Sequence, residues 1–371
     1  MIFLGSIVPL PGLLPLNGTP RAKFVVLHHV GRLQPGDRIR MSNLPQLLVI
    51  GCGSIGERHL RTFLATGRCA LIACDSSSAI TERMATRYGV ETTSDWQSCL
   101  TRRSLTGVVI ATPAPLHVRM ASRALAAGLH VLIEKPLSVD LTDCDALLRQ
   151  RDTSGKFVGV AYVHHFQPAL VQARDFLLAQ KFGSLKHIAV NAGHHFPTAR
   201  PAYRDIYYRD HAQGGGAIQD ALTHMANAVE WVAGPATRVS CDASHQVLDG
   251  VTVEDTVNVA ARHGDVLVSY SLNQFQSFNE TRLDFHAQRG SVRVELHAQR
   301  WGACALGAAD WTWHSCPIAD RDQLFVSQAH AFLDACEGRP SALCTLEEGI
   351  QTLRFNLAAL KSCRDQQPVT P

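Results

Sequence analysis

Short apolar runs alternate with segments of helical periodicity in the first half of the chain. The apolar runs occupy residues 46–50, 70–74, 108–111, 129–133 and 157–161, and the periodic segments between them occupy residues 57–66, 79–88, 117–127 and 141–151. Strands that are apolar on both faces are typical of a parallel sheet covered by helices on both sides. We therefore predict an α/β, doubly wound Rossmann domain over residues 44–163.

The pattern changes after residue 164. Apolar and polar residues alternate over 257–261 and 266–270, on either side of Gly264, and the alternation returns over 283–296 around Gly290. Such alternation predicts antiparallel strands with one buried face. Helical periodicity marks residues 168–180, 217–232 and 325–336, and a capping box formed by Thr345 and Glu348 precedes a last helix through residue 360. We expect a C-terminal α+β domain over residues 164–371, built on a mainly antiparallel open sheet.

The first 43 residues differ from the rest. Residues 1–16 are apolar but short, contain three prolines and lack preceding basic residues, so they fit neither a membrane span nor a signal peptide. Met41 stands just before the first strand. We interpret residues 1–43 as an N-terminal extension, either foreign to the natural protein or a loosely attached arm.

Composition narrows the function classes. The chain has 371 residues, 46% of them hydrophobic, and a net charge of +3 without runs of like charge. Nothing therefore favours nucleic acid or a membrane as the main partner. The 11 cysteines are scattered with no C-x-x-C pair, which argues against a disulfide framework or a structural zinc site and favours a reducing, cytoplasmic location.

A glycine-rich turn follows the first predicted strand. The first glycine allows a tight turn, the second admits a diphosphate, and the third lets helix and strand pack closely. The helix N-terminus adds free N–H groups. We expect cofactor contacts from Gly51, Gly53, Ser54, Ile55 and Gly56.

Asp75 ends the second predicted strand, where a carboxylate would bond a ribose 2′-hydroxyl and repel a 2′-phosphate. No cation stands beside it in Ser76–Ser78, so NAD is favoured over NADP. The alternative is a tight strand–helix turn in which Asp75 is only a cap.

Two further loops follow parallel strands. Thr112, Pro113 and His117 follow one strand, and Glu134 and Lys135 follow the next. The carboxyl edge of such a sheet is where ligands bind, so we expect these residues to line the nicotinamide side. A lysine there could orient a hydroxyl or take its proton. The alternative is a surface lysine paired with Glu134.

A triple glycine, 214–216, precedes Asp220 and His224. Residues four apart share one face of a helix, so Asp220 could orient His224 as a proton acceptor. The alternative is a histidine satisfied within a helix. Asp and His could also bind a metal, but no third ligand has suitable spacing, and we predict no metal site. His165, Arg204 and Tyr208 are candidates for binding substrate, as is His164, whereas the pair at 194–195 is expected to be incidental.

Five motifs in this order resemble the glucose–fructose oxidoreductase/inositol dehydrogenase/MocA-type family. They are GCGSIG, ATPAPLH, EKPL, GGGAIQDALTH and VEDT, with a further match over residues 331–353. The resemblance spans residues 44–369 and implies a Rossmann domain followed by a domain whose open sheet forms oligomer contacts, as in a homodimer or homotetramer. It places Lys135, Asp220 and His224 near nicotinamide and substrate. Many relatives carry arginine at the position of His165, so the resemblance does not extend to substrate recognition by this chain.

The expected function is an NAD-dependent oxidoreductase acting on a secondary hydroxyl of a polyol, sugar or sugar derivative. His224 would accept the hydroxyl proton, Lys135 would orient the oxygen or share the base role, and Asp220 would hold His224. Two alternatives stay open. One is glycosidic cleavage through transient oxidation by a retained NAD, and the other is a non-catalytic NAD-binding regulator.

Overall fold

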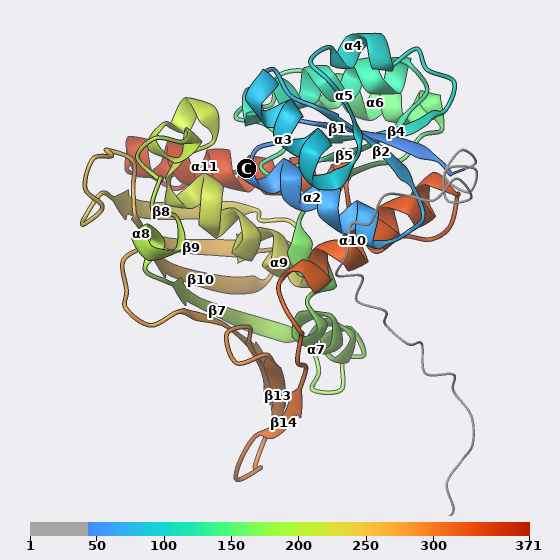
Figure 1. Cartoon of the computed structure of the whole chain (residues 1–371). Coiled ribbons are helices and arrows are strands. Elements are labelled where there is room, and N and C mark those ends of the chain that lie inside the picture. Colours follow the sequence, from blue (N-terminus) through green and yellow to red (C-terminus); the bar gives the residue numbers. More distant parts are fainter. Residues whose placement is uncertain (1–43) are drawn as a thin grey trace, which may run out of the picture.

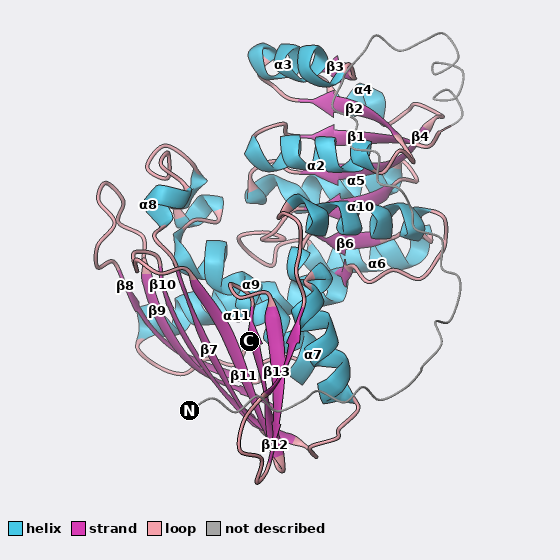
Figure 2. Ribbon diagram, turned by 60° about the horizontal axis from the view of Figure 1, so that its bottom comes forward, coloured by secondary structure: helices cyan, strands magenta, loops and turns pink. Residues whose placement is uncertain are grey.

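A computed structural model describes residues 44–371 and shows two sheets, each with its own helices (Figure 1). The predictions for residues 1–43 lie outside the described residues. One sheet carries helices on both faces, and the other carries them on one face only (Figure 2). The predicted fold class is confirmed.

The first sheet has seven strands in the order β15-β6-β5-β4-β1-β2-β3. All neighbours pair in parallel except β15 with β6. The strands are β1 (Gln46–Ile50), β2 (Ala70–Cys74), β3 (Glu91–Thr93), β4 (Leu105–Ile110), β5 (His130–Ile133), β6 (Val158–Val160) and β15 (Cys344–Thr345). The five apolar runs are confirmed as its inner strands, whereas β3 and β15 have no apolar run to mark them.

Burial on both faces explains why these strands are apolar throughout. In β1, Leu47 and Val49 face a core shared with α2, α3 and α10, while Leu48 and Ile50 face a core shared with α5, α6 and α11. The helices are α2 (Ser54–Ala65), α3 (Ser78–Tyr88), α4 (Trp96–Cys99), α5 (His117–Ala126), α6 (Cys144–Ser154), α10 (Asp322–Cys336) and α11 (Leu346–Asp365).

The C-terminal part of the chain returns to the first sheet. In α10, Phe332 packs with Phe63 of α2, with ring centroids 5.9 Å apart, and β15 adds a strand beside β6. A boundary at residue 163 therefore does not separate the two domains, because residues 322–345 complete the first. Periodicity shows that a helix has an apolar face but does not say which sheet the face covers.

The second sheet has eight strands in the order β14-β13-β12-β11-β7-β10-β9-β8, antiparallel except for β7 with β10. The strands are β7 (Leu185–Gly193), β8 (Arg238–Ser244), β9 (Thr256–His263), β10 (Val266–Asn273), β11 (Glu280–Ala287), β12 (Gly290–Glu295), β13 (Arg300–Ala305) and β14 (Thr312–Ser315). The alternating residues of β9 and β10 are buried and exposed in turn, as predicted.

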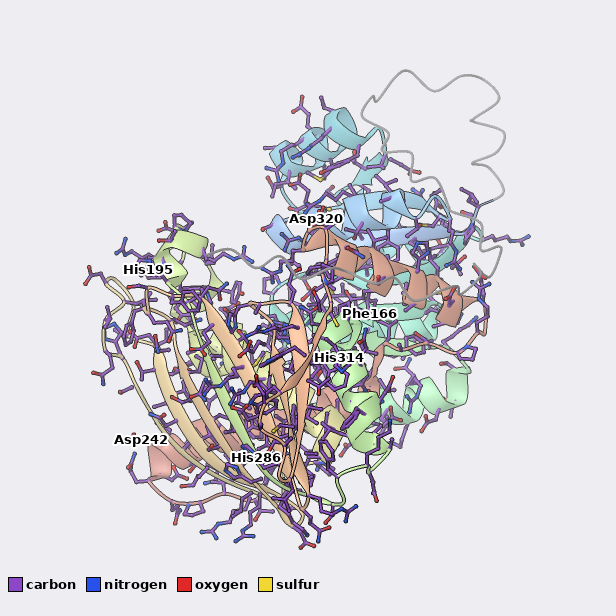
Figure 3. All side chains as sticks on the ribbon, turned by 90° about the horizontal axis from the view of Figure 1, so that it is seen from below. Phe166, His195, Asp242, His286, His314 and Asp320 are labelled. Carbon is purple, nitrogen blue, oxygen red and sulfur yellow. The ribbon has the colours of Figure 1, made fainter. Side chains whose placement is uncertain are left out.

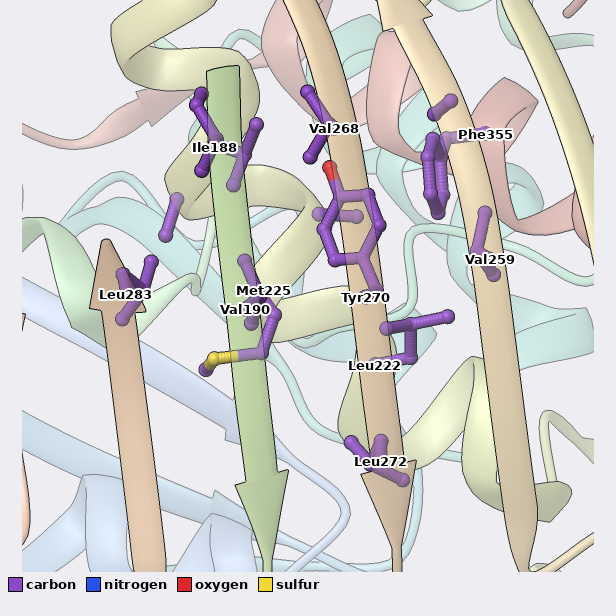
Figure 4. Packing of buried hydrophobic residues seen from close by; sticks show 14 of the residues in the cluster. Ile188, Val190, Leu222, Met225, Val259, Val268, Tyr270, Leu272, Leu283 and Phe355 are labelled. Atoms are coloured by element: carbon purple, nitrogen blue, oxygen red, sulfur yellow. The ribbon is translucent and has the colours of Figure 1, made fainter. Parts of the chain in front are cut away.

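One face of this sheet packs against α7 (Pro168–Leu178), α9 (Thr223–Ala233) and α11. The side chains at its centre are Ile188, Val190, Val268, Tyr270, Leu272, Leu222, Met225 and Phe355 (Figure 4). No helix within residues 44–371 is long and apolar enough to cross a bilayer.

The helix expected over residues 217–232 is not uniform. It begins as a π-helical turn, η5 (Ile218–Leu222), and continues as α9. A π turn holds more residues than an α turn, so residues on its two sides lose the usual i, i+4 alignment. The remaining short helices are η1 (Ala114–Leu116), η2 (Val163–Phe166), α8 (Phe196–Ala199), η3 (Tyr207–Arg209) and η4 (His211–Gln213).

Candidate active site

The glycine turn between β1 and α2 has three distinct steric environments. Gly51 has φ +84°, and a Cβ there would lie 2.6 Å from the Ala111 carbonyl oxygen. A Cβ at Gly56 would lie 1.7 Å from the Gly51 carbonyl oxygen. A Cβ at Gly53 would meet nothing within 4 Å. Two glycines therefore permit the packing, and Gly53 leaves open space at the N-terminus of α2, where a dinucleotide diphosphate fits.

Asp75 lies beside this turn. Its carboxylate accepts hydrogen bonds from the backbone N–H of Cys52 at 2.8 Å and of Ser77 at 2.9 Å. Within residues 44–371 it forms no ion pair with a lysine or arginine, so its negative charge is available to favour a ribose hydroxyl over a phosphate. The residues fit NAD.

His117 links two loops at the carboxyl edge of the sheet. Its Nδ1 lies 3.0 Å from the Pro136 carbonyl oxygen, and its Nε2 lies 2.7 Å from that of Thr112. The ring is buried, so its role in this structure is to hold the loops after β4 and β5 together. The bond between Lys135 and Pro136 is cis.

Both carboxylate oxygens of Glu134 also form hydrogen bonds within the protein. One carboxylate oxygen lies 2.7 Å from His59 Nε2 of α2, and the other accepts the Lys135 backbone N–H at 3.0 Å. Burial would raise the pKa of Glu134, but the His59 hydrogen bond and the Lys135 charge hold it below its ordinary value. The alternative that Lys135 pairs with Glu134 through its ammonium is wrong.

Lys135 reaches instead to the start of the helix on the other domain. Its Nζ donates to the Asp220 carbonyl oxygen at 2.9 Å and lies 3.2 Å from Asp220 Oδ1. The Tyr207 hydroxyl donates to the same Oδ1 at 2.6 Å. Burial would raise the pKa of Asp220, but the Lys135 ammonium and the Tyr207 hydroxyl lower it, so the carboxylate is ionised.

The prediction that Asp220 holds His224 is therefore wrong. Asp220 lies in the π turn and His224 in the α-helix that follows, so the i, i+4 contact of a regular helix does not form. Asp220 holds Lys135 instead.

His224 is surrounded mainly by aromatic rings. Its ring centroid lies 6.0 Å from that of Tyr162, edge to face, and 5.1 Å from that of His164. Its buried Nδ1 has no hydrogen-bond partner among the described residues. Burial and the positive charge of Lys135 lower its pKa well below the ordinary value, so His224 is neutral near pH 7 and is a weaker base than a free imidazole.

The three residues proposed to bind substrate, His165, Arg204 and Tyr208, form their hydrogen bonds outside the Lys135–Asp220 pair. The His165 ring stacks on Trp231, with centroids 4.2 Å apart, and its Nδ1 lies 3.3 Å from the Ala342 carbonyl oxygen. A ring nitrogen of His165 also lies close to the side chains of Cys344 and Glu348. Each of these three residues offers one atom that could bind a metal ion, and the three atoms lie within 4.8 Å of one another. His164, not His165, faces His224.

Tyr208 and Arg204 hydrogen-bond other parts of the protein and not the Lys135–Asp220 pair. The Tyr208 side chain is fully buried, and its hydroxyl donates to the Gln274 side chain. Arg204 Nε donates to the Asp249 carbonyl oxygen at 2.8 Å. The adjacent Tyr207 contacts Asp220 instead. Substrate binding by Tyr208 and Arg204 stays a prediction.

Sequence reasoning missed four other residues at or near this cluster, namely Tyr207, His194, Arg200 and Arg321. The charges of Arg200 and Arg321 act on the pKa values of Asp220 and His224, and Asp220 acts on that of His194. The only sequence signal for Tyr207 was its position beside Tyr208. Nothing in the local pattern distinguished the other three.

Residues 46–162 match the family described as "Oxidoreductase family, NAD-binding Rossmann fold", and residues 170–293 match the "GFO/IDH/MocA C-terminal domain". The chain is 25% identical to myo-inositol dehydrogenase Hyg17 of Streptomyces leeuwenhoekii over 87% of this chain and 99% of that protein. It is 26% identical to 1,5-anhydro-D-fructose reductase of Ensifer adhaerens over 70% of this chain and 78% of that one.

The fold is also similar to solved structures. A levoglucosan dehydrogenase in complex with NADH and levoglucosan superimposes with a TM-score of 0.79 at 20% identity, over 88% of this chain and 98% of that chain. The likeness spans both domains.

Proposed function

We propose that this protein, which belongs to the GFO/IDH/MocA family of NAD-binding oxidoreductases, interconverts a secondary hydroxyl and a ketone on a polyol, sugar or sugar derivative. The relatives named above act on inositol and on an anhydrosugar. The fold places an NAD-type glycine turn and a lysine–aspartate pair at the same carboxyl edge of one sheet.

The Lys135–Asp220 contact is the observation that supports this function most directly. It joins the loop after β5 in one domain to η5 in the other, so contact between the two domains holds the lysine in place. An ammonium has three N–H groups, and with two of them directed at Asp220 one remains to bind a substrate oxygen. Lys135 would thus orient the reacting hydroxyl and favour the negative charge that develops on its oxygen.

His224 would accept the hydroxyl proton. Its neutral state leaves one ring nitrogen free to act as acceptor, and its neighbours Tyr162 and His164 fix the plane of the ring. NAD, held by the glycine turn and Asp75, supplies the hydride acceptor when bound.

Two further features support an intracellular oligomer. All 11 cysteines are free, as a reducing compartment permits. The exposed face of β9 and β10 carries Asn258, Ala260, Ser269 and Ser271 together with Arg262 and Leu267. We propose a cytoplasmic homodimer or homotetramer that joins these faces, which light scattering on the purified protein would measure.

Substitution of Lys135 and His224 tests the catalytic roles. We expect Lys135→Met and His224→Ala to lower kcat by about 10²-fold or more, with NAD affinity within about threefold of the wild type. Rates would be followed by absorbance of the reduced cofactor across a panel of polyols and sugars, and Lys186→Met, on the exposed surface of β7, is the matched control.

Unchanged turnover in both variants would contradict these roles. Failure of the wild type to bind either nicotinamide coenzyme would overturn the proposed function as a whole. Retained NAD with sugar cleavage and no net NADH release would instead identify the glycosidase alternative.

A further inference from the structure

Three side chains that can bind a metal ion meet outside the Lys135–Asp220 cluster. His165 comes from η2, Cys344 from β15 and Glu348 from the first turn of α11. One candidate ligand atom of each lies within 4.8 Å of the other two. His165 and Cys344 are only 2% and 1% exposed, so these two groups have little access to water.

Strand pairing and packing bring the three residues together. Cys344 pairs with Val160 of β6, and η2 follows β6 in the chain. Phe166, labelled in Figure 3, follows His165 and packs against the core shared with α2 and α10. The cluster therefore lies at the edge of the first sheet, beside the segment that leads into the second domain.

The hydrogen bonds of His165 leave one ring nitrogen without a partner. Nδ1 lies 3.3 Å from the Ala342 carbonyl oxygen, so this nitrogen carries the proton and donates a hydrogen bond. Nε2 is buried and has no hydrogen-bond partner among the described residues. Metal-bound histidines have the same arrangement, in which one nitrogen donates to a carbonyl or carboxylate and the other binds the ion.

The two acidic groups of the cluster receive few hydrogen bonds. Glu348 Oε2 accepts the Thr345 N–H at 2.8 Å in the capping box, but the carboxylate forms no ion pair within residues 44–371. Cys344 Sγ receives one N–H, from Asn227 Nδ2 at 3.5 Å. Buried atoms that offer electron pairs without matching N–H or O–H groups are stabilised by a cation.

We propose that His165, Cys344 and Glu348 bind a structural zinc ion. Imidazole, thiolate and carboxylate are all zinc ligands, and the two negative charges balance Zn²⁺ in a buried site. Binding forms the Zn–S bond and releases the thiol proton to solvent. A tetrahedral zinc ion holds such atoms about 3.3–3.6 Å apart, so the three atoms close by at most about 1.5 Å.

A fourth ligand would complete the tetrahedron. Asn227 Oδ1 is buried without a hydrogen-bond partner among the described residues, and Asn227 already contacts Cys344 through Nδ2. Rotation of this amide, or a water molecule, would fill the position. The assignment gives His165 a structural role in place of the predicted substrate contact. The expectation of no metal site came from spacing along the chain, and His165 is far from Cys344 in the sequence.

Metal titrations test the proposal without any turnover. The full-length protein is titrated with Zn²⁺ against a chromophoric chelator, and with Co²⁺, whose bond to a thiolate absorbs in the near ultraviolet. We expect one zinc ion per chain, bound more tightly than about 1 μM and more tightly as the pH rises, because the thiol must lose its proton. Zinc should also raise the Tm of the wild type.

Substitution of each ligand should weaken zinc binding. We expect a loss of about 100-fold or more in Cys344→Ser and in His165→Gln, with no cobalt–thiolate absorption in Cys344→Ser. Glu348→Gln retains a side chain that can form the capping box, so its helix should stay intact while zinc binding weakens by about 10- to 100-fold. Circular dichroism without zinc checks that each variant is folded.

Cys99→Ser is the matched control. Cys99 is also fully buried, but it lies in α4, which contacts β1 and not the β6–β15 edge. This variant should bind zinc and cobalt as the wild type does.

Two results would overturn the proposal. One is that the wild type takes up no zinc ion at the expected affinity. The other is that Cys344→Ser and Glu348→Gln bind zinc as tightly as Cys99→Ser, which would assign the metal to other cysteines or histidines of the chain. Neither result bears on the proposed dehydrogenase activity, which is tested separately with NAD and the panel of polyols and sugars.

Discussion

The glycine turn and the Lys135–Asp220 cluster lie at the same edge of the first sheet but are built differently. Backbone shape makes the turn, within the short segment between β1 and α2. Side chains make the cluster, and they come from the loop after β5 and from η3 and η5, which are far apart in the sequence. A site made by a short backbone segment can be predicted from the spacing of its residues in the sequence. A site assembled from distant side chains depends on which of several adjacent residues points toward it in the folded structure.

The largest expected effect is at the turn itself. Gly56→Ala forces a Cβ to within 1.7 Å of the Gly51 carbonyl oxygen, so strand and helix must separate. We expect a loss of about 3 kcal/mol or more in the free energy of unfolding, measured by denaturant titration, together with loss of NAD binding.

Gly53→Ala sharpens this prediction, because its Cβ meets no protein atom within 4 Å. This variant should unfold as the wild type does but bind NAD at least about tenfold more weakly, since the methyl group occupies space expected for the diphosphate. Equal NAD affinity in Gly53→Ala and the wild type would contradict the assignment of the turn.

The neighbouring tyrosines provide a second, smaller contrast. Tyr207→Phe removes the hydroxyl that donates to Asp220, so we expect kcat/KM to fall by about tenfold with little change in stability. Tyr208→Phe removes a buried hydrogen bond to Gln274 and should cost about 1 kcal/mol of stability with little change in kcat/KM. Steady-state rates and thermal melts of both variants would measure this. A fall in kcat/KM in Tyr208→Phe, with a loss of stability alone in Tyr207→Phe, would show that Tyr208 faces the substrate.

The smallest expected effect is on the pH dependence of stability. Burial lowers the pKa of His164 from 6.5 to about 4. Between these values the unfolded chain binds a proton that the folded protein excludes, so this contribution is complete above pH 6.5 and is lost as the pH falls toward 4. His164→Gln should therefore reduce the loss of unfolding free energy between pH 7 and pH 4.5 by on the order of 1–3 kcal/mol.

Denaturant titrations at several pH values would measure this difference. His195→Gln, an exposed histidine on the neighbouring loop, is the control. An identical pH dependence in the His164 variant and the wild type would show that His164 is not held neutral by burial.

Much of the first domain could be predicted because its signals are local. Apolar runs long enough to be buried on both faces marked the inner strands, and the glycine spacing marked the turn. The edge strand β3 was missed because its residues are polar and partly exposed. The sequence did not predict that β15 and α10 belong to the first domain. Strand pairing across about 180 residues produces no local sequence pattern around either strand.

The candidate site was predicted in part for the same reason. Lys135 was expected at the carboxyl edge of the sheet and lies there. The partner of Asp220 was wrong because a single π turn changes which side chains align. His165, Arg204 and Tyr208 were proposed from polarity alone, which does not distinguish a side chain that faces a ligand from one that bonds to the backbone.

The sequence by itself determined the α/β order, the two kinds of sheet and the dinucleotide turn, because each follows from the period of apolar residues or from the steric freedom of glycine. Tertiary structure alone decided that Lys135 pairs with Asp220, that His164 rather than His165 lies beside His224, and that Tyr207 rather than Tyr208 hydrogen-bonds Asp220. Such contacts depend on the rotation of each element about its axis and on the packing of the two domains, and neither is encoded in any short stretch of the chain.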